Sequence, residues 1–344
     1  IEQEAVDALV IAGDIYDRSV PPASAVTMLD EFISRICSDM QVPVILIPGN
    51  HDGAERLSFG SRQLSSAGLH IIGDLKQVEE PVLIKSEAGD IAFYGIPYND
   101  PETIRNLFDA DVTSYDEAHT FLVDKIKLVK NEDQQSVLIS HCFLDGAQES
   151  ESERPLSIGG ADRVSYEPCV DFDYVALGHL HSPQYKGEEH IRYSGSILKY
   201  SFSEQNQKKG VTLVELDQNG LKQSRHLPLK PLRDMRIVEG EIQAILEQGK
   251  VDPNNEDYLL VRLTDRTAIL DPMNKLRSVY PNILHLEKPG MLETGDQKVS
   301  RETLKRGELE MFRDFFVQIT GQALNDAQDE AIQQAITELN KQEA

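Results

Sequence analysis

The sequence predicts an α/β protein, with a layered β-sheet domain flanked by helices, a small α+β domain and a helical C-terminal tail. Short apolar, β-branched runs alternate with helical segments through the first 230 residues, which is typical of buried parallel strands. The pattern changes after the stretch at 228–231, where we expect strands at 236–238, 258–263 and 283–286 and helices near 241–248 and 272–279. An amphipathic helix follows a polar segment beyond Pro289. We therefore expect three parts, at 1–230, 231–290 and 291–344.

Four apolar runs, at 8–12, 42–47, 136–139 and 174–177, each lead into a short polar motif. The crossover between the first two runs begins after Pro21 and Pro22, and apolar residues recur at helical spacing up to Met40. A capping-box pattern at Ser114 and Glu117 predicts the start of a further helix, and hairpins are expected near Gly89 and Asn219. Ligands bind outside the carboxyl ends of strands in open α/β sheets. We therefore expect the motifs at one edge of one sheet.

The four motifs carry the side chains of a two-metal phosphoesterase site. A Gly-Asp pair alone is more often just a turn, but aspartate, asparagine and histidine recurring after strands suit Mn, Fe or Zn. In the last motif, two histidines flank a leucine and point to the same face of an extended chain. The motifs read Gly13-Asp14-Ile15-Tyr16-Asp17, Gly49-Asn50-His51-Asp52, Ser140-His141 and Gly178-His179-Leu180-His181.

The order of these motifs resembles the calcineurin-like metallophosphoesterases, and the flanking residues resemble the bacterial SbcD nuclease subunits within that superfamily. The discriminating segments are Tyr193-Ser194-Gly195-Ser196, continuing to Glu204, and Tyr280-Pro281-Asn282, continuing to Glu287. The resemblance covers nearly the whole chain. It implies two divalent metal ions, Mn²⁺ in particular, that hydrolyse DNA phosphodiester bonds.

The resemblance also implies roles for individual residues. Asp14 bridges both metals, Asn50, His141 and His179 complete the second metal, and His181 serves the first. His51 is the catalytic histidine that donates a proton or hydrogen bond. Asp17 either orients His51 or is only a helix-entry residue. The other histidines, at 70, 119, 190, 226 and 285, are expected to be solvated or core residues.

One departure from the family concerns the first metal. The superfamily begins with an Asp-x-His motif at the end of a first strand, and no such motif precedes Asp14. We expect the sequence to be truncated at its N-terminus, lacking one strand and two ligands. Hydrolysis by these residues alone should be weak or absent. The alternative is a non-catalytic scaffold that keeps the fold, and an upstream Asp-x-His motif would distinguish the two.

Composition limits the other possibilities. The three cysteines, Cys37, Cys142 and Cys169, are widely spaced, which indicates a reduced cytoplasmic protein. No apolar run in the sequence approaches the length of a membrane span. Cys142 faces away from its neighbour His141, so a catalytic Cys-His pair is not expected. The net charge of −24 argues against a DNA-coated surface. A local basic segment from Lys199 to Arg236 is either one wall of a substrate groove or a solvated hairpin.

The C-terminal part is expected to serve partners. The resemblance implies that 231–290 is a capping domain that shapes DNA access. It also implies an SbcC subunit that supplies the ATPase, and a homodimer of the nuclease subunit. A stripe of Leu309, Phe312, Phe316 and Ile319 ends at Gly321, and it either packs on its own domain or binds SbcC; we favour the partner.

The sequence therefore predicts a DNA nuclease subunit of an SbcCD-type complex. The expected activities are exonuclease action on duplex ends and endonuclease action on single strands or hairpins, in DNA repair and recombination. A calcineurin-like phosphoesterase acting on nucleotides or phosphoproteins is the enzymatic alternative.

Overall fold

The computed structural model describes residues 1–86, 89–153, 162–265, 267, 269–288 and 308–342. The chain forms two compact units, Ile1–Pro231 and Leu232–Ala344. The first boundary expected from the sequence lies one residue earlier. The expected boundary at 290 and the loop of Pro155, Gly159 and Gly160 lie outside the described residues.

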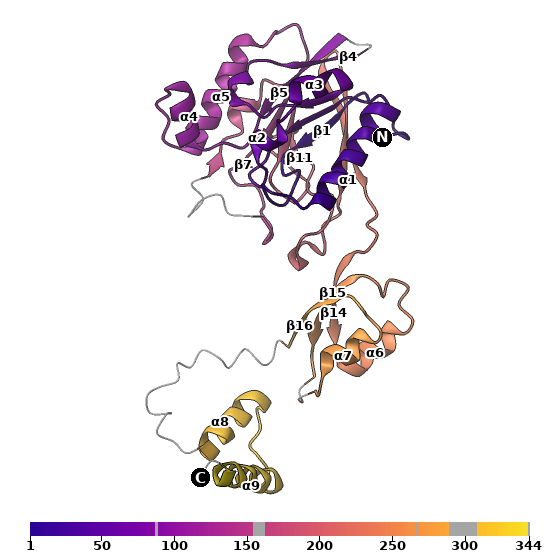
Figure 1. The fold of residues 1–344 in the computed structure, drawn as a ribbon, viewed down its shortest axis with the longest axis vertical. Helices are drawn as coiled ribbons and strands as arrows, with labels where there is room; N and C mark the ends of the chain where they lie inside the picture. The colour runs from indigo at the N-terminus through magenta and orange to yellow at the C-terminus, as the bar shows by residue number, and fades with distance from the viewer. Residues whose placement is uncertain (87–88, 154–161, 266, 268, 289–307, 343–344) are drawn as a thin grey trace. The chain divides into compact units, whose positions relative to one another are not determined.

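The first unit contains two principal β-sheets (Figure 1). The smaller sheet is parallel, in the order β1-β2-β3, with β1 at Leu9–Ala12, β2 at Val44–Ile47 and β3 at Leu69–Ile71. The larger has the order β10-β11-β9-β6-β5-β4. Its strands are β4 (Val82–Ser86), β5 (Gly89–Ile96), β6 (Ser136–His141), β9 (Tyr174–Gly178), β10 (Gln184–Lys186) and β11 (Glu188–Tyr193).

The expectation of a single sheet edge is therefore wrong. The strands before Asp14 and Asn50 belong to the smaller sheet, whereas the strands before His141 and His179 belong to the larger one. The physical reason lies in a shared apolar layer, in which Ile45 and Ile47 of β2 pack with Val137 and Ile139 of β6. Burial of both faces makes the four strands before the motifs read as continuous apolar runs, so sheet membership is not visible in the pattern.

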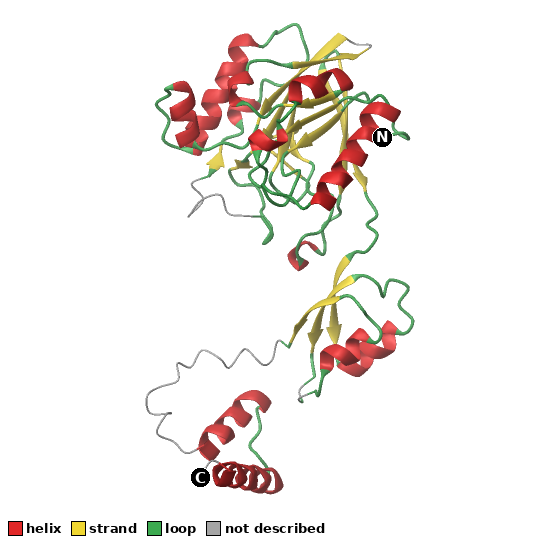
Figure 2. Cartoon of the chain, in the orientation of Figure 1, coloured by secondary structure: helices red, strands yellow, loops and turns green. Residues whose placement is uncertain are grey.

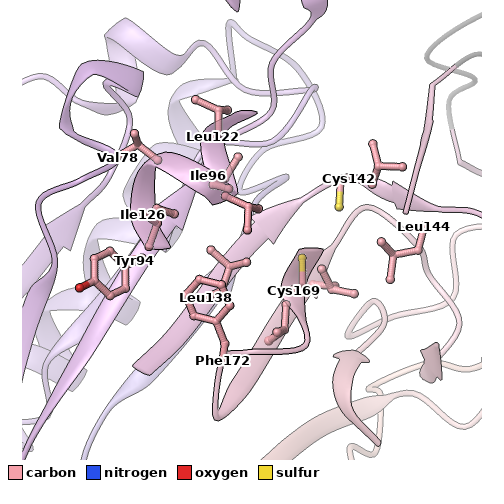
Figure 3. Packing of buried hydrophobic residues seen from close by; sticks show 14 of the residues in the cluster. Val78, Tyr94, Ile96, Leu122, Ile126, Leu138, Cys142, Leu144, Cys169 and Phe172 are labelled. Atoms are coloured by element: carbon pink, nitrogen blue, oxygen red, sulfur yellow. The ribbon is translucent and has the colours of Figure 1, made fainter. Parts of the chain in front are cut away.

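Helices cover the outer faces of the two sheets (Figure 2). Helix α1 (Ala23–Ser34), with a π-helical turn at Arg35–Asp39, buries Ile33 and Ile36 against the smaller sheet. Helix α5 (Tyr115–Val129) buries Leu122 and Ile126 against the larger sheet (Figure 3). The result is a helix–sheet–sheet–helix arrangement, in which each amphipathic element buries its apolar side.

Local sequence signals account for the connecting elements. Ser114 and Glu117 form the expected capping box at the start of α5, and α4 (Pro101–Phe108) begins after the N-cap Asp100. The hairpins expected at Gly89 and Asn219 are formed by β4–β5 and by β12–β13. The remaining short elements are α2 (Ala54–Leu57), α3 (Ser61–Leu64), β7 (Phe143–Leu144), β8 (Arg163–Val164), β12 (Gly210–Asp217) and β13 (Gly220–Pro228).

The second unit begins with a parallel three-stranded sheet of order β14-β15-β16, with strands Met235–Gly240, Tyr258–Leu263 and Ile283–Glu287. Helices α6 (Ile242–Gly249) and α7 (Pro272–Arg277) supply Ile245 and Leu276 to its separate core. All five elements were expected from the sequence, with ends shifted by a few residues.

Two further helices, α8 (Glu308–Thr320) and α9 (Asp326–Gln342), follow the undescribed residues 289–307. Arg313 Nε of α8 donates a hydrogen bond of 2.6 Å to Asp329 Oδ1 of α9, which joins the two helices. The stripe residues Leu309, Phe312, Phe316 and Ile319 are half-buried, whereas Phe315 is 55% exposed. In the described part of the chain, no helix has both the length and the apolar character needed to cross a membrane.

Candidate metal centre

Asp14 lies at the centre of the candidate site, just beyond the end of β1. The turn that presents it has positive φ at both Gly13 and Asp14, 92° and 50°. The backbone N–H of His51 donates a 3.0 Å hydrogen bond to Asp14 Oδ1. Asp14 Oδ2 lies 3.4 Å from Nε2 of His141. The carboxylate thus contacts groups from both sheets.

Asn50, His141 and His179 face Asp14 from three different strand ends. Asn50 Oδ1 lies 2.9 Å from His141 Nε2 and 3.2 Å from His179 Nδ1. Ligand atoms of Asp14, His141 and His179 all lie within 4.8 Å of one another. The structure therefore brings together four of the five residues expected to bind metal.

The orientation of the His141 ring places one nitrogen toward the other members of the cluster. His141 Nδ1 donates a hydrogen bond of 2.8 Å to the backbone oxygen of Ala12, because a carbonyl oxygen can only accept. The other ring nitrogen, Nε2, faces the amide oxygen of Asn50 and the carboxylate of Asp14. Carboxylate, amide and imidazole groups therefore converge, and this set of ligands suits a divalent cation such as Mn, Fe or Zn.

The pKa values of two cluster members agree with this interpretation. Burial, then the nearby His141, lowers the pKa of His179 to about 4, so its ring is neutral and has a free lone pair at pH 7. Burial alone would raise the pKa of Asp14, but hydrogen bonding and charge from His141 and the His51 N–H bring it down to about 2. Asp14 is therefore an anion across the physiological range.

His51 and Asp17 are adjacent, but the contact differs from the expected one. His51 Nδ1 donates to the backbone oxygen of Asp17 at 3.0 Å, whereas the nearest carboxylate oxygen of Asp17 lies 4.0 Å away. The Asp17 side chain is 71% exposed and binds Arg18. The main chain of Asp17 thus orients the ring, which leaves Nε2 of His51 as the atom that can take or give a proton.

His181 lies outside the group formed by Asp14, His141 and His179. Its Nδ1 is 3.1 Å from Glu204 Oε1 and 2.8 Å from the Ser152 hydroxyl. His181 is thus the one expected ligand that does not share a contact with Asp14 or Asn50 within the described residues.

Sequence reasoning missed Asp52, which ties the site's loops together. Its carboxylate accepts hydrogen bonds from the backbone N–H groups of Ile15, Tyr16 and Gly49, at 3.0, 2.9 and 2.9 Å. Asp52 stands inside the Gly-Asn-His-Asp motif, so the motif itself was the available signal. Glu204 was also missed, because 23 residues separate it from His181 and no short spacing relates them.

Other residues with reactive side chains have structural roles. Cys142 packs in the core beside Cys169, Leu138 and Leu144 (Figure 3), and burial raises its pKa to about 12, so it does not act as a nucleophile. His119 is also a core residue, as expected, and its Nε2 lies 2.9 Å from the Ser140 hydroxyl.

Most of the basic segment is occupied by ion pairs. Lys209 is buried against Glu204, and Arg236 binds Asp252 and Asp257. Lys222, Arg225 and Arg233 contact Glu215, Glu4 and Glu256, respectively. Lys209 is buried, and the carboxylates beside the other basic groups offset their positive charge, so these contacts weaken the groove-wall interpretation.

The two-sheet sandwich and the Asp–Asn–His cluster between its strand ends define a metallophosphoesterase. Residues 1–183 match the family model described as calcineurin-like phosphoesterase, and 231–320 match SbcD_C, described as type 5 capsule protein repressor C-terminal domain. The chain is 34% identical over 338 residues to the SbcD component of the nuclease SbcCD from Staphylococcus epidermidis, covering 98% of this chain and 89% of the relative. The chain belongs to this SbcD family of calcineurin-like phosphoesterases, whose fold implies divalent metals.

Proposed function

We propose that this protein is the nuclease subunit of an SbcCD-type complex and hydrolyses DNA phosphodiester bonds with two divalent cations, Mn²⁺ in particular. Asp14, Asn50, His141 and His179 would hold one cation, and Asp14 with His181 would contribute to the other. The observation that carries the proposal is the convergence of Asp14, Asn50, His141 and His179 at the strand ends, where ligand atoms of Asp14, His141 and His179 lie within 4.8 Å of one another.

The chain's own residues divide the work of the reaction. When bound, a pair of divalent cations would activate water and neutralise the charge that develops on the phosphate oxygens. Asp14 stays anionic and fixes the cluster, and the Ala12 carbonyl fixes the His141 ring. His51, held through Nδ1, offers Nε2 to the phosphate or the leaving oxygen.

The proposed substrates are duplex ends, single strands and hairpins, in DNA repair and recombination. A net charge of −24 and the many paired basic side chains do not favour tight DNA binding by this chain alone. We therefore propose that SbcC supplies much of the DNA affinity as well as the ATPase, and that the nuclease subunit is a homodimer. The three free, buried cysteines fit a reducing cytoplasm.

The test is a cleavage assay with linear duplex, hairpin DNA and a small phosphodiester as substrates. We expect Mn²⁺-dependent cleavage of both DNA substrates, loss of at least about 10²-fold in His141→Ala, and no change in Asp39→Asn, at an exposed position of the π-helical turn. Cleavage of the small phosphodiester alone would favour a nucleotide or phosphoprotein phosphoesterase, and no metal-dependent cleavage would favour a scaffold.

The helical pair α8–α9 is the proposed SbcC-binding segment. Phe315 and Val317 of α8 are exposed, and α8 carries the apolar stripe that suits a partner helix or groove. Deletion of 301–344 should abolish co-purification with SbcC and leave the thermal unfolding of the first unit unchanged. Retained co-purification would refute this assignment. The single substitution Phe315→Ser, at an exposed ring that lies 6.4 Å from the ring of Phe312 in the stripe, tests α8 without a deletion.

A further inference from the structure

A buried ion pair lies directly behind His181. Glu204 is fully buried, and its Oε2 lies 2.6 Å from Nζ of Lys209, which is 7% exposed. The other oxygen, Oε1, lies 3.1 Å from His181 Nδ1. It also accepts a hydrogen bond from the Ser152 hydroxyl. The buried carboxylate therefore joins one lysine, one serine and one histidine.

Lys209 acts on the same histidine from the opposite side. Its Nζ donates to the backbone oxygen of His181 at 2.8 Å. It also donates to Ser196 Oγ and Gln207 Oε1, both at 2.7 Å. The ion pair thus fixes the main chain of His181 through Lys209 and the ring through Glu204, so both ends of the residue are held by one unit.

The chemistry of these partners selects one form of the imidazole. The buried ammonium of Lys209, 2.6 Å from Oε2, favours the ionised form of Glu204. An ionised carboxylate accepts hydrogen bonds and donates none. The Ser152 hydroxyl donates its one hydrogen to Glu204. Toward His181 Nδ1, the Ser152 oxygen can therefore only accept a hydrogen bond. A neutral His181 ring must then hold its proton on Nδ1, which leaves the lone pair on Nε2.

Stability alone is a weak explanation for such a pair. Taking two charges out of water costs several kcal/mol per ion, and apolar replacement of a buried ion pair is often neutral or stabilising. A buried carboxylate that binds the outer nitrogen of a histidine, in contrast, commonly orients that histidine toward a metal. The position of Glu204 matches the second role, because the histidine it contacts is an expected metal ligand.

We propose that Glu204 is a positioning residue for His181, held by Lys209, which keeps the proton on Nδ1 and directs Nε2 to a divalent cation. The metal part of this inference rests on the proposed function, whereas the tautomer part does not.

The decisive measurement is the His181 tautomer in metal-free protein, by ¹⁵N-labelled histidine NMR at about pH 7.5, where an unperturbed imidazole is mostly neutral. We expect Nδ1–H in the native protein, and a mixture of tautomers in Glu204→Gln, whose amide can also donate. The matched control is Asp252→Asn, which removes a carboxylate from the Arg236 ion pair in the second unit and should leave the His181 signals unchanged. Unchanged Nδ1–H in Glu204→Gln would overturn the proposal.

Mn²⁺ titration calorimetry gives the second readout. Outer contacts of this kind change metal affinity about 10- to 100-fold, so Glu204→Gln should weaken one Mn²⁺ site by at least about tenfold, with no change in Asp252→Asn. If the native protein binds no Mn²⁺ while the tautomer still responds to Glu204→Gln, the proposed function fails and the positioning role stands. Native Mn²⁺ affinity in Glu204→Gln would refute the metal part of the inference.

A second variant tests the proposal if Glu204→Gln fails to fold. Glu204→Gln leaves Lys209 buried without its carboxylate, which is destabilising. The double variant Glu204→Gln with Lys209→Met removes both charges, and the same tautomer change is expected from it. Lys209→Met alone should loosen Glu204 and shift the His181 signals in the same direction but by a smaller amount.

Discussion

Asp52 links the two loops that carry Asp14 and Asn50. Its carboxylate accepts three backbone N–H groups, two from the loop after β1 and one from the loop after β2. These hydrogen bonds satisfy three backbone N–H groups that would otherwise need water, and they fix the separation between Asp14 and Asn50. A single side chain therefore couples the two loops of the smaller sheet.

Substitution of Asp52 by Asn should weaken both the fold and the metal site. One carboxylate oxygen becomes an N–H donor that faces backbone N–H groups, so we expect a loss of about 1–3 kcal/mol in the free energy of unfolding. Urea unfolding and Mn²⁺ titration check this result. The exposed Asp39→Asn is the control and should change neither. Native stability and Mn²⁺ affinity in Asp52→Asn would contradict this role.

Asp17 and His51 meet through the backbone of Asp17 and not through its carboxylate. The sequence places the two in motifs that meet, and the structure brings them together, but the contact uses the Asp17 backbone oxygen. A main-chain contact does not depend on residue type, so spacing cannot distinguish it from a carboxylate contact. Asp17 can therefore be a helix-entry residue and still orient His51 through its backbone oxygen.

At the scale of elements, the close approach of β9 to β1 shapes the site. A Cβ at Gly178 would overlap the backbone oxygen of Ala12 and would lie 2.8 Å from His141 Nδ1. These are the two atoms that form the hydrogen bond fixing the His141 ring. Only glycine leaves room for this bond between the larger and the smaller sheet.

Gly178→Ala should therefore separate the strand ends and displace His141. Overpacking of a tight contact costs about 1–3 kcal/mol, and we expect a loss of Mn²⁺ affinity together with this destabilisation. Thermal unfolding and Mn²⁺ titration measure the two effects. The control is Gly53→Ala, whose nearest contact would be Ser19 O at 3.2 Å, and it should have a smaller effect on both. Equal effects would show that the Ala12–His141 contact is not decisive.

At the scale of the whole molecule, the chain has two units, each with its own core. Leu122 is fully buried in the first unit, between α5 and the larger sheet, and Leu259 is fully buried in the second, on β15. The two cores share no residue. A domain with its own core is expected to unfold as its own cooperative unit.

Calorimetry of the full chain should therefore show two unfolding transitions. Leu122→Ala should lower only one of them and Leu259→Ala only the other, each by about 2–5 kcal/mol of unfolding free energy. Each variant serves as the control for its counterpart. A single transition that both variants lower equally would show that the units unfold together.

The sequence by itself determined the strands that precede each motif, the capping box of α5, the five elements of the first part of the second unit and most of the membership of the site. These features depend on local patterns, namely apolar runs, helical spacing and short polar motifs, which a linear reading preserves.

Only the tertiary structure decided that the site joins two sheets, that Asp17 acts through its backbone, and that Glu204 lies behind His181. Residues far apart in the chain meet because Ile45, Ile47, Val137 and Ile139 bury a common apolar layer. Burial on both faces erases the alternation that would assign a strand to its sheet. The contact between Glu204 and His181 depends on folding of the intervening residues, which no short spacing encodes.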